Sequence, residues 1–224
     1  MAVAFSTGVA STNNTTAVSA TLNVNANDLV LVGFGYTGST VAPTIFVNST
    51  AATVIASQSS QPTTGAVTAY QALVYSQPSA TGVLTVSCTM SSNFGAAMSV
   101  ATYSGVHKTS PIGSTAKSTG NSTTPSIAVN SSAGSLSIGY AAYPSTLVSN
   151  VTGISSGTGS VLRSSALSTA DFVAVAAALS EVPSSAVAST AAWVVNDLAA
   201  KNWASFGVTL NPAAVGGPQI HWMQ

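Results

Sequence analysis

The chain has 224 residues, of which 4% are charged, and its formal net charge at pH 7 is zero. Ordinary soluble domains carry about 25% charged residues, so this surface has little charge with which to keep copies of the protein apart. The scattered basic residues, Lys108, Lys117, Arg163 and Lys201, argue against binding to nucleic acid, and the 46% of hydrophobic residues argue against a disordered chain.

The first residues, from Met1 to Ser11, lack the basic start and the continuous apolar core of a secretory signal. No stretch of the chain approaches the roughly 18 consecutive apolar residues that a membrane-spanning helix needs. We therefore expect a protein that is used without this route of export, or one whose leader precedes Met1.

Short runs of alternating apolar and small polar residues follow one another along the chain, separated by Gly, Pro, Asn and Ser. This pattern predicts half-buried β-strands. A first set of strands is expected near residues 17–24, 28–36, 44–48, 52–58, 66–76, 82–89 and 96–104. A second set is expected near residues 125–130, 135–143, 147–154, 160–168, 171–181, 186–195 and 203–211. The alanine-rich stretch 170–182 has the composition of a helix, but its Val and Phe spacing favours a strand.

Gly33, Gly35 and Gly38 form a GxGxxG pattern directly after an apolar run. A dinucleotide-binding loop would need a helix that begins at the third glycine and an acidic residue about 20 positions later. Pro43 and β-branched residues follow instead, and no Asp or Glu occurs between Asp28 and Asp171. We interpret the segment as a strand end with glycine at a bend and expect no cofactor.

The two sets of strands resemble each other. Leu22–Asn25 precedes DLVLVGFGY as Ile127–Asn130 precedes SLSIGYAAY, and such matches keep an offset of about 105 to 107 residues, as a duplication would. The sequence predicts an all-β protein with two tandem antiparallel β-sandwich or jelly-roll domains related by internal duplication. The expected boundaries are 1–108 for the first sandwich, 109–124 for a linker, 125–211 for the second sandwich and 212–224 for a C-terminal tail. One larger sandwich built from two similar halves is the alternative.

No combination of residues indicates a catalytic, cofactor-binding or metal site, and we expect no enzyme. The four carboxylates and two histidines are scattered: Asp28, Asp171, Glu181, Asp197, His107 and His221. The aspartates stand at turn positions, the histidines lack metal-ligand spacing, and no GxSxG marks a nucleophile. The single cysteine, Cys88, is expected to be buried and can form no disulfide within the chain.

Two groups of residues are candidates for contacts or modification. The candidate glycosylation acceptors are Asn14, Asn48, Asn121, Asn130 and Asn150, although chance alone gives roughly four such sequons in this composition. Trp193 and Trp203 are expected in the core rather than on a sugar-binding platform. Ile220, His221, Trp222 and Met223 form an apolar tail after a Gly-Pro hinge. Such a tail either folds back on its own domain or docks on a neighbouring subunit or a membrane-associated partner.

The segments DLVLVGFGYTG, VYSQPSATGVLTVSCTM and MSVATYSGVHKTSPI, repeated in degenerate form, resemble low-charge β-sandwich modules of bacterial and archaeal surface proteins and of virus structural proteins. The element YSGV…TSPI at 103–112 is the most specific. In size, duplication and composition the chain is most similar to penton-base or turret proteins of icosahedral archaeal viruses.

This resemblance implies a virion structural protein that assembles in the host cytoplasm. Its partners would be copies of itself and other capsid or surface proteins. An extracellular filament or surface-layer subunit is the alternative, and a carbohydrate-binding adhesive module is a second alternative.

Overall fold

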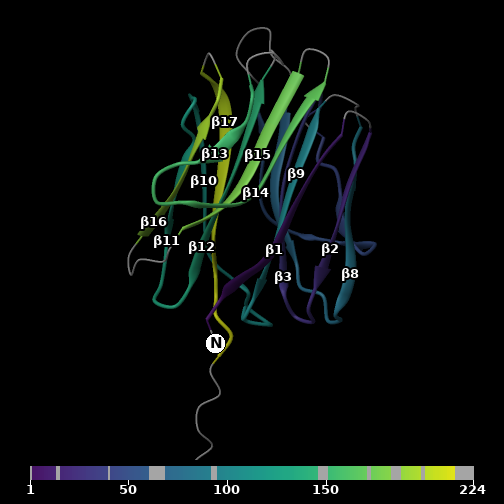
Figure 1. The fold of residues 1–224 in the computed structure, drawn as a ribbon, viewed down its shortest axis with the longest axis vertical. Coiled ribbons are helices and arrows are strands. Elements are labelled where there is room, and N and C mark those ends of the chain that lie inside the picture. Colours follow the sequence, from purple (N-terminus) through teal and green to yellow (C-terminus); the bar gives the residue numbers. More distant parts are fainter. Residues whose placement is uncertain are drawn as a thin grey trace, which may run out of the picture.

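The computed structural model describes residues 2–13, 16–39, 41–60, 69–91, 95–145, 151–170, 173–182, 188–197 and 200–214. All regular structure in these residues is β-strand (Figure 1). The all-β prediction is therefore confirmed, and residues Val173–Val182 of the alanine-rich stretch 170–182 form a strand.

The strands form two units that follow each other in the sequence. Unit 1 contains β1 (Ala4–Asn13), β2 (Ala17–Val24), β3 (Leu29–Thr37), β4 (Ile45–Val47), β5 (Thr50–Ala51), β6 (Thr53–Ser60), β7 (Ala69–Ser76), β8 (Gly82–Thr89) and β9 (Ala96–Ser104). Unit 2 contains β10 (Ile112–Ser122), β11 (Ser126–Asn130), β12 (Leu136–Ser145), β13 (Ile154–Ser156), β14 (Val161–Ala170), β15 (Val173–Val182), β16 (Ala188–Val195) and β17 (Lys201–Leu210).

Each unit is a sandwich of one five-stranded sheet and one smaller sheet. Unit 1 has the orders β1-β9-β3-β7-β6 and β2-β8-β4-β5, and unit 2 has the orders β10-β17-β12-β15-β14 and β11-β16-β13. Neighbouring strands pair antiparallel, as β3 does with β9 and β12 with β17. Along the chain the strands of each unit pass repeatedly from one sheet to the other, which is the order of a jelly roll.

The two units also share their irregularities. The ladder between β1 and β9 shifts register between Phe5 and Thr7, and the ladder between β10 and β17 shifts at the corresponding place, between Ile112 and Thr115. The edge ladders β6-β7 and β14-β15 carry a second matching pair of shifts. A shared topology with shared bulges is what the predicted repeat requires, while descent from one duplicated segment stays a prediction.

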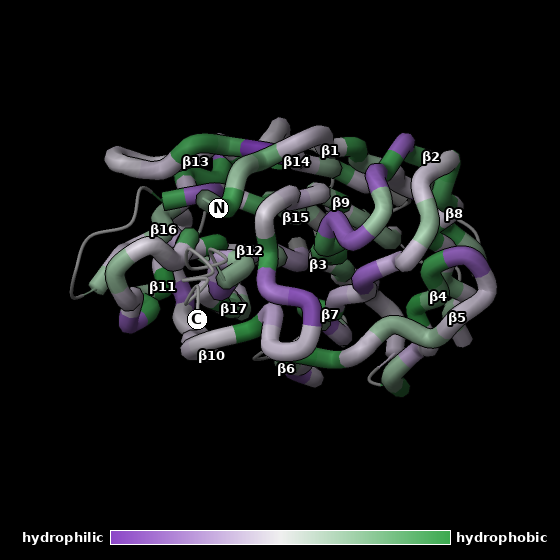
Figure 2. The backbone as a smooth tube through the Cα atoms, turned by 90° about the horizontal axis from the view of Figure 1, so that it is seen from below, coloured by the Kyte–Doolittle hydropathy of each residue, from purple (hydrophilic) through white to green (hydrophobic). Residues whose placement is uncertain are grey.

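The five-stranded sheets of the two units pack face to face, so the molecule has four layers (Figures 1 and 2). Three cores result, one inside each unit and one between the units. The core between the units combines Leu29, Leu31 and Tyr103 of unit 1 with Ile138 and Phe206 of unit 2, among others. The structure thus has features of both predicted arrangements, because each half is a sandwich and the halves share a core.

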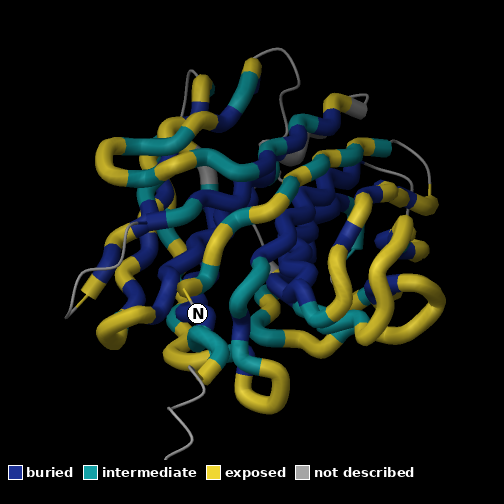
Figure 3. Tube along the Cα trace, turned by 60° about the horizontal axis from the view of Figure 1, so that its bottom comes forward, coloured by how far each residue is buried: buried dark blue, intermediate teal, exposed yellow. Residues whose placement is uncertain are grey.

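The inner strands of the two middle layers, such as β3 and β9, consist almost entirely of buried residues (Figure 3). All nine residues of β3 are buried, which explains its nearly continuous apolar run, since a strand covered on both faces has no need of alternation. The strands of the two outer sheets alternate between buried and exposed residues, as in β2 and β16.

Gly33 shows how closely the units approach each other. A Cβ atom on Gly33 would lie 2.1 Å from Cδ2 of Tyr140, which projects from β12 of unit 2. The glycine therefore serves close packing in the middle of a strand, and its interpretation as part of a strand end was wrong. The bend follows at Gly38, whose φ of 95° suits glycine.

The units fill their own cores differently. In unit 2 the indole of Trp193 lies over Gly139, with Cη2 2.6 Å from where a Cβ would stand. When the shared bulges and strand registers are aligned, Val32 of unit 1 occupies the place of Gly139, and Val86 occupies the place of Trp193. Unit 1 fills this place with two valines of medium size, and unit 2 fills it with a tryptophan and a glycine.

Two long strands were missed in the sequence, besides the two-residue strand β5. β1 was not predicted, and β10 occupies most of the predicted linker 109–124, so the connection between the units is residues 105–111. Both are edge strands of a five-stranded sheet, and neither contains a fully buried residue. Their Ser, Thr and Gly content therefore resembles that of a loop. Residues 147–150 of the predicted strand 147–154 lie outside the described residues, residues 151–153 are not strand, and β13 covers Ile154–Ser156.

Candidate assembly surface

The predicted contact residues of the tail, Ile220, His221, Trp222 and Met223, lie outside the described residues, and so do Asn14 and Asn150. The other glycosylation candidates are exposed. Asn48 lies in the turn between β4 and β5, with a φ of 47°, and its Oδ1 accepts a hydrogen bond from the backbone N–H of Thr85 at 2.9 Å.

Asn121 lies on β10, where its Nδ2 donates to Oδ1 of Asn202 at 2.9 Å. Asn130 is the last residue of β11. The three described sequons therefore lie on different strands or turns and are not gathered into one site.

The ionisable side chains are not gathered into a site either. Within the described ranges, no three His, Cys, Asp or Glu side chains stand close enough together to hold a metal ion. Asp28 is buried in a turn, where its Oδ2 accepts from the backbone N–H of Asn25 at 3.1 Å. Nδ1 of His107 accepts from the backbone N–H of Ser110 at 3.1 Å, so both groups stabilise loops. Burial raises the pKa of the Cys88 thiol to about 12, which makes it a poor nucleophile.

One ion pair joins neighbouring strands of unit 2. Nε of Arg163 on β14 lies 2.7 Å from Oε2 of Glu181 on β15, and their side chains are 25% and 16% exposed. The guanidinium also lies 4.5 Å from the ring centre of Phe5 on β1 of unit 1, within the range of a cation–π contact. This cluster holds β1 of unit 1 against β14 of unit 2 and so stabilises the contact between the units.

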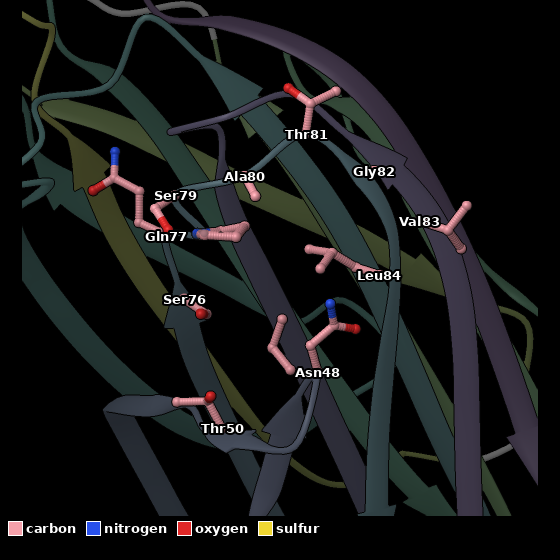
Figure 4. Close-up of a pocket in the computed structure, with 12 residues that line it drawn as sticks. Asn48, Thr50, Ser76, Gln77, Ser79, Ala80, Thr81, Gly82, Val83 and Leu84 are labelled. Carbon is pink, nitrogen blue, oxygen red and sulfur yellow. The ribbon is translucent and has the colours of Figure 1, made fainter.

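A shallow groove of about 410 Å³ lies between the β7–β8 connection and the Asn48 turn (Figure 4). Its lining contains hydroxyl, amide and aliphatic groups, with no charged and no aromatic side chain among the twelve lining residues. The Gln77 amide is already engaged, because its Nε2 donates to the backbone oxygen of Asn27 at 2.9 Å. The groove offers hydrogen bonds to a neutral ligand but neither a base nor a nucleophile with a lowered pKa.

The outward sides of the two smaller sheets are continuous surfaces without charged side chains. We call the first outer face 1; its residues are Ala17, Ser19, Thr21, Asn23, Phe46, Val83, Thr85, Ser87 and Thr89. We call the second outer face 2; its residues are Ser126, Ala128, Asn130, Ser155, Ala188, Thr190, Ala192 and Val194. The strands of both smaller sheets contain no Asp, Glu, Lys, Arg or His at any position.

The outer faces carry hydroxyl and methyl groups side by side. Thr21 stands directly opposite Thr85, and Ser19 stands opposite Ser87, on the paired strands β2 and β8. Val83, which is 67% exposed, is the most exposed large apolar side chain in the described part of the chain. Charged residues lie elsewhere, in the large sheet of unit 2 or in connections between strands.

The sequence held a signal for these faces. In β2, β8 and β16 every second residue is buried, and the residues between them are uncharged. The alternation identifies the solvent side of each strand, and the lack of charge on that side could have singled it out. The described residues contain no helix long and apolar enough to cross a membrane.

Comparisons with known proteins found no match, whether with protein-family models, with curated proteins or with solved structures.

Proposed function

We propose that this protein is a structural subunit that works by associating with copies of itself, and that the assembly it builds belongs to a virion. The observation that carries the proposal is the pair of outer faces without a charged side chain. A free monomer normally keeps charge on such surfaces to remain soluble, whereas a subunit of an assembly covers them with neighbouring copies.

The rest of the molecule supports a structural role. The ionisable groups described above stabilise turns and strand contacts, and the groove beside the Asn48 turn offers only neutral hydrogen-bonding groups. Two sandwiches that share a central core make one stiff body, which suits a building block. The resemblance of the sequence to penton-base and turret proteins supports placing the assembly in a virion.

A filament or surface-layer subunit is the second candidate. The outer faces lie at opposite ends of the four layers (Figure 2), and contacts at opposite ends extend in a line unless the rotation between copies closes them into a ring. This geometry favours a filament as much as a capsid vertex.

The test is the association state of the purified chain. Sedimentation velocity over a range of concentrations is expected to show species larger than the monomer. Because uncharged contacts are hardly screened, the distribution should change little between low salt and about 1 M salt. Negative-stain images then separate the candidates, since rings support the vertex and open fibres support the filament. A single monomeric species at high protein concentration would contradict both.

A further inference from the structure

The outer faces define the direction in which copies can associate. Outer face 1 and outer face 2 belong to the first and last layers, and the two middle layers lie between them (Figures 1 and 2). We infer that copies of this chain stack end to end, with an outer face of one copy covering an outer face of the next. This inference rests on the proposed function and names the surface that serves it.

The chemistry of the faces fits a second copy better than a charged partner. A charged partner surface would lose hydration on contact and would meet no opposite charge, and such desolvation is costly. A second copy presents the same Ser, Thr, Ala, Asn and Val side chains. These are short, so burying them costs little rotamer entropy, and their hydroxyls can both donate and accept hydrogen bonds.

The flanks of unit 2 are less suitable for self-association. Lys117 lies exposed on the edge strand β10, and its Nζ donates to the backbone oxygen of Ser57 on β6 at 3.2 Å. Arg163 lies on the edge strand β14 of the same large sheet. Charged side chains on edge strands protect a sheet against pairing with another chain. The positive charge of Lys117 therefore disfavours association at the β10 edge, and Arg163 is paired with Glu181 at the β14 edge, whereas the edge strands β1 and β6 of unit 1 carry no charged residue.

The expected strength follows from the size of the faces. Strands lie about 4.8 Å apart and rise about 3.3 Å per residue, so the 21 strand residues of the first small sheet cover roughly 330 Å² and the 16 strand residues of the second cover roughly 250 Å². A stable interface covers about 800 Å² on each partner. One face contact is therefore weak, but a copy inside a stack makes two such contacts. Association should be reversible and should depend steeply on concentration.

Two residues allow a direct test. Thr85 lies on β8, an inner strand of its sheet, and Thr190 lies on β16, the central strand of the other small sheet. Both threonines are exposed, so a long charged side chain at either position can reach solvent in the monomer. In a stack it would be buried without a partner. Thr119→Lys on the exposed side of β10 is the matched control, since it adds the same charge to a flank.

The experiment compares the full-length wild type with Thr85→Lys, Thr190→Glu and Thr119→Lys by sedimentation velocity, with thermal melts to establish that each variant is folded. We expect both face variants to raise the concentration of half-association at least tenfold and the flank variant to leave it within about twofold. Mixing Thr85→Lys with Thr190→Glu should restore association if unlike faces meet. Mixing Thr85→Lys with Thr85→Glu should restore it if like faces meet.

The outcomes separate this inference from the proposed function. A wild type that stays monomeric contradicts the proposed function itself. A wild type that associates while both face variants associate equally well overturns only the stacking inference, and so does a flank variant that dissociates the assembly as strongly as the face variants do.

Discussion

Gly33→Ala tests whether the two units form one cooperative body. Its new Cβ would stand 2.1 Å and 2.3 Å from Cδ2 and Cε2 of Tyr140, whereas carbon atoms in contact are normally about 3.5 to 4.0 Å apart. The ring cannot easily move, because it stacks on Phe206 with the ring centres 6.1 Å apart. The backbones cannot easily separate either, since β3 and β12 lie in sheets that are covered on both faces.

The expected loss of stability comes from two opposing effects. Overpacking a filled core costs about 1 to 3 kcal/mol, and this site lies at the upper end because the Tyr140 ring is fully buried and stacked on Phe206. Replacing a glycine inside a strand by alanine returns roughly 0.5 to 1 kcal/mol. The net decrease in the free energy of unfolding is therefore about 2 kcal/mol, which in a domain of this size lowers Tm by roughly 4 to 8 °C.

Urea unfolding followed by two signals is the suitable assay. Trp193 and Trp203 are buried in unit 2, so tryptophan fluorescence in a Trp222→Phe background reports on unit 2, while far-UV circular dichroism reports on both units. A change at Gly33 in unit 1 should shift both transitions together. Gly153→Ala is the control, because no atom stands within 4 Å of its Cβ position, and it should change stability by less than about 0.5 kcal/mol.

Two results would refute the reasoning. An unchanged midpoint in Gly33→Ala would mean that the contact with Tyr140 is not tight. A shift of the dichroism signal with an unmoved fluorescence transition would mean that the units unfold independently.

Three further predictions concern single side chains. The Tyr140 hydroxyl is buried without a hydrogen-bond partner, so Tyr140→Phe should raise the free energy of unfolding by about 1 to 2 kcal/mol in the same urea assay; a loss of stability would indicate a hidden partner. Glu181→Gln should lower the free energy of unfolding by about 1 to 2 kcal/mol, between the values for surface and buried ion pairs. Lys108→Gln on an exposed loop is the control and should be neutral; equal effects of the two substitutions would contradict a stabilising ion pair. Burial raises the pKa of the Cys88 thiol from 9.0 to about 12, so the stability that the neutral thiol contributes is complete below pH 9 and is lost as the pH rises toward 12. Cys88→Ala should therefore weaken the loss of stability at alkaline pH. Rapid reaction of the native thiol with a thiol reagent at pH 8 would contradict its burial.

Much of the fold could be predicted because most strands bury at least one face. Alternation in β2 and β16, and the continuous apolar run of β3, gave these strands their correct class and approximate position. The repeat of apolar segments also indicated two similar halves. These signals are local in the sequence, since the spacing of buried side chains follows directly from strand geometry.

The remaining features depend on contacts that are distant in the sequence. β1 and β10 are strands because β9 and β17 offer them backbone partners, and their own side chains carry no apolar alternation. Gly33 is required by Tyr140, which lies far away in the chain and in the other unit. The face-to-face packing of the large sheets is likewise absent from any local pattern, although the long apolar runs show that both faces of these strands are buried.

The candidate surface could be predicted in part. Alternation in β2, β8 and β16 marks their uncharged solvent-facing residues, but which strands join into one outer face required the strand order. The tail residues that the sequence singled out, Ile220 to Met223, lie outside the described residues, so their role in contacts stays a prediction.

The different cores of the two units affect how the newly made chain avoids pairing strands of one unit with strands of the other. Tandem domains of similar sequence can exchange strands during folding and become trapped in wrong pairings. If β16 took the place of β8, the indole of Trp193 would meet Val32 instead of Gly139 and would find no room. If β8 took the place of β16, Val86 would leave a void above Gly139. The different core residues of the two halves therefore favour the native strand pairings, because each strand packs well only in its own half.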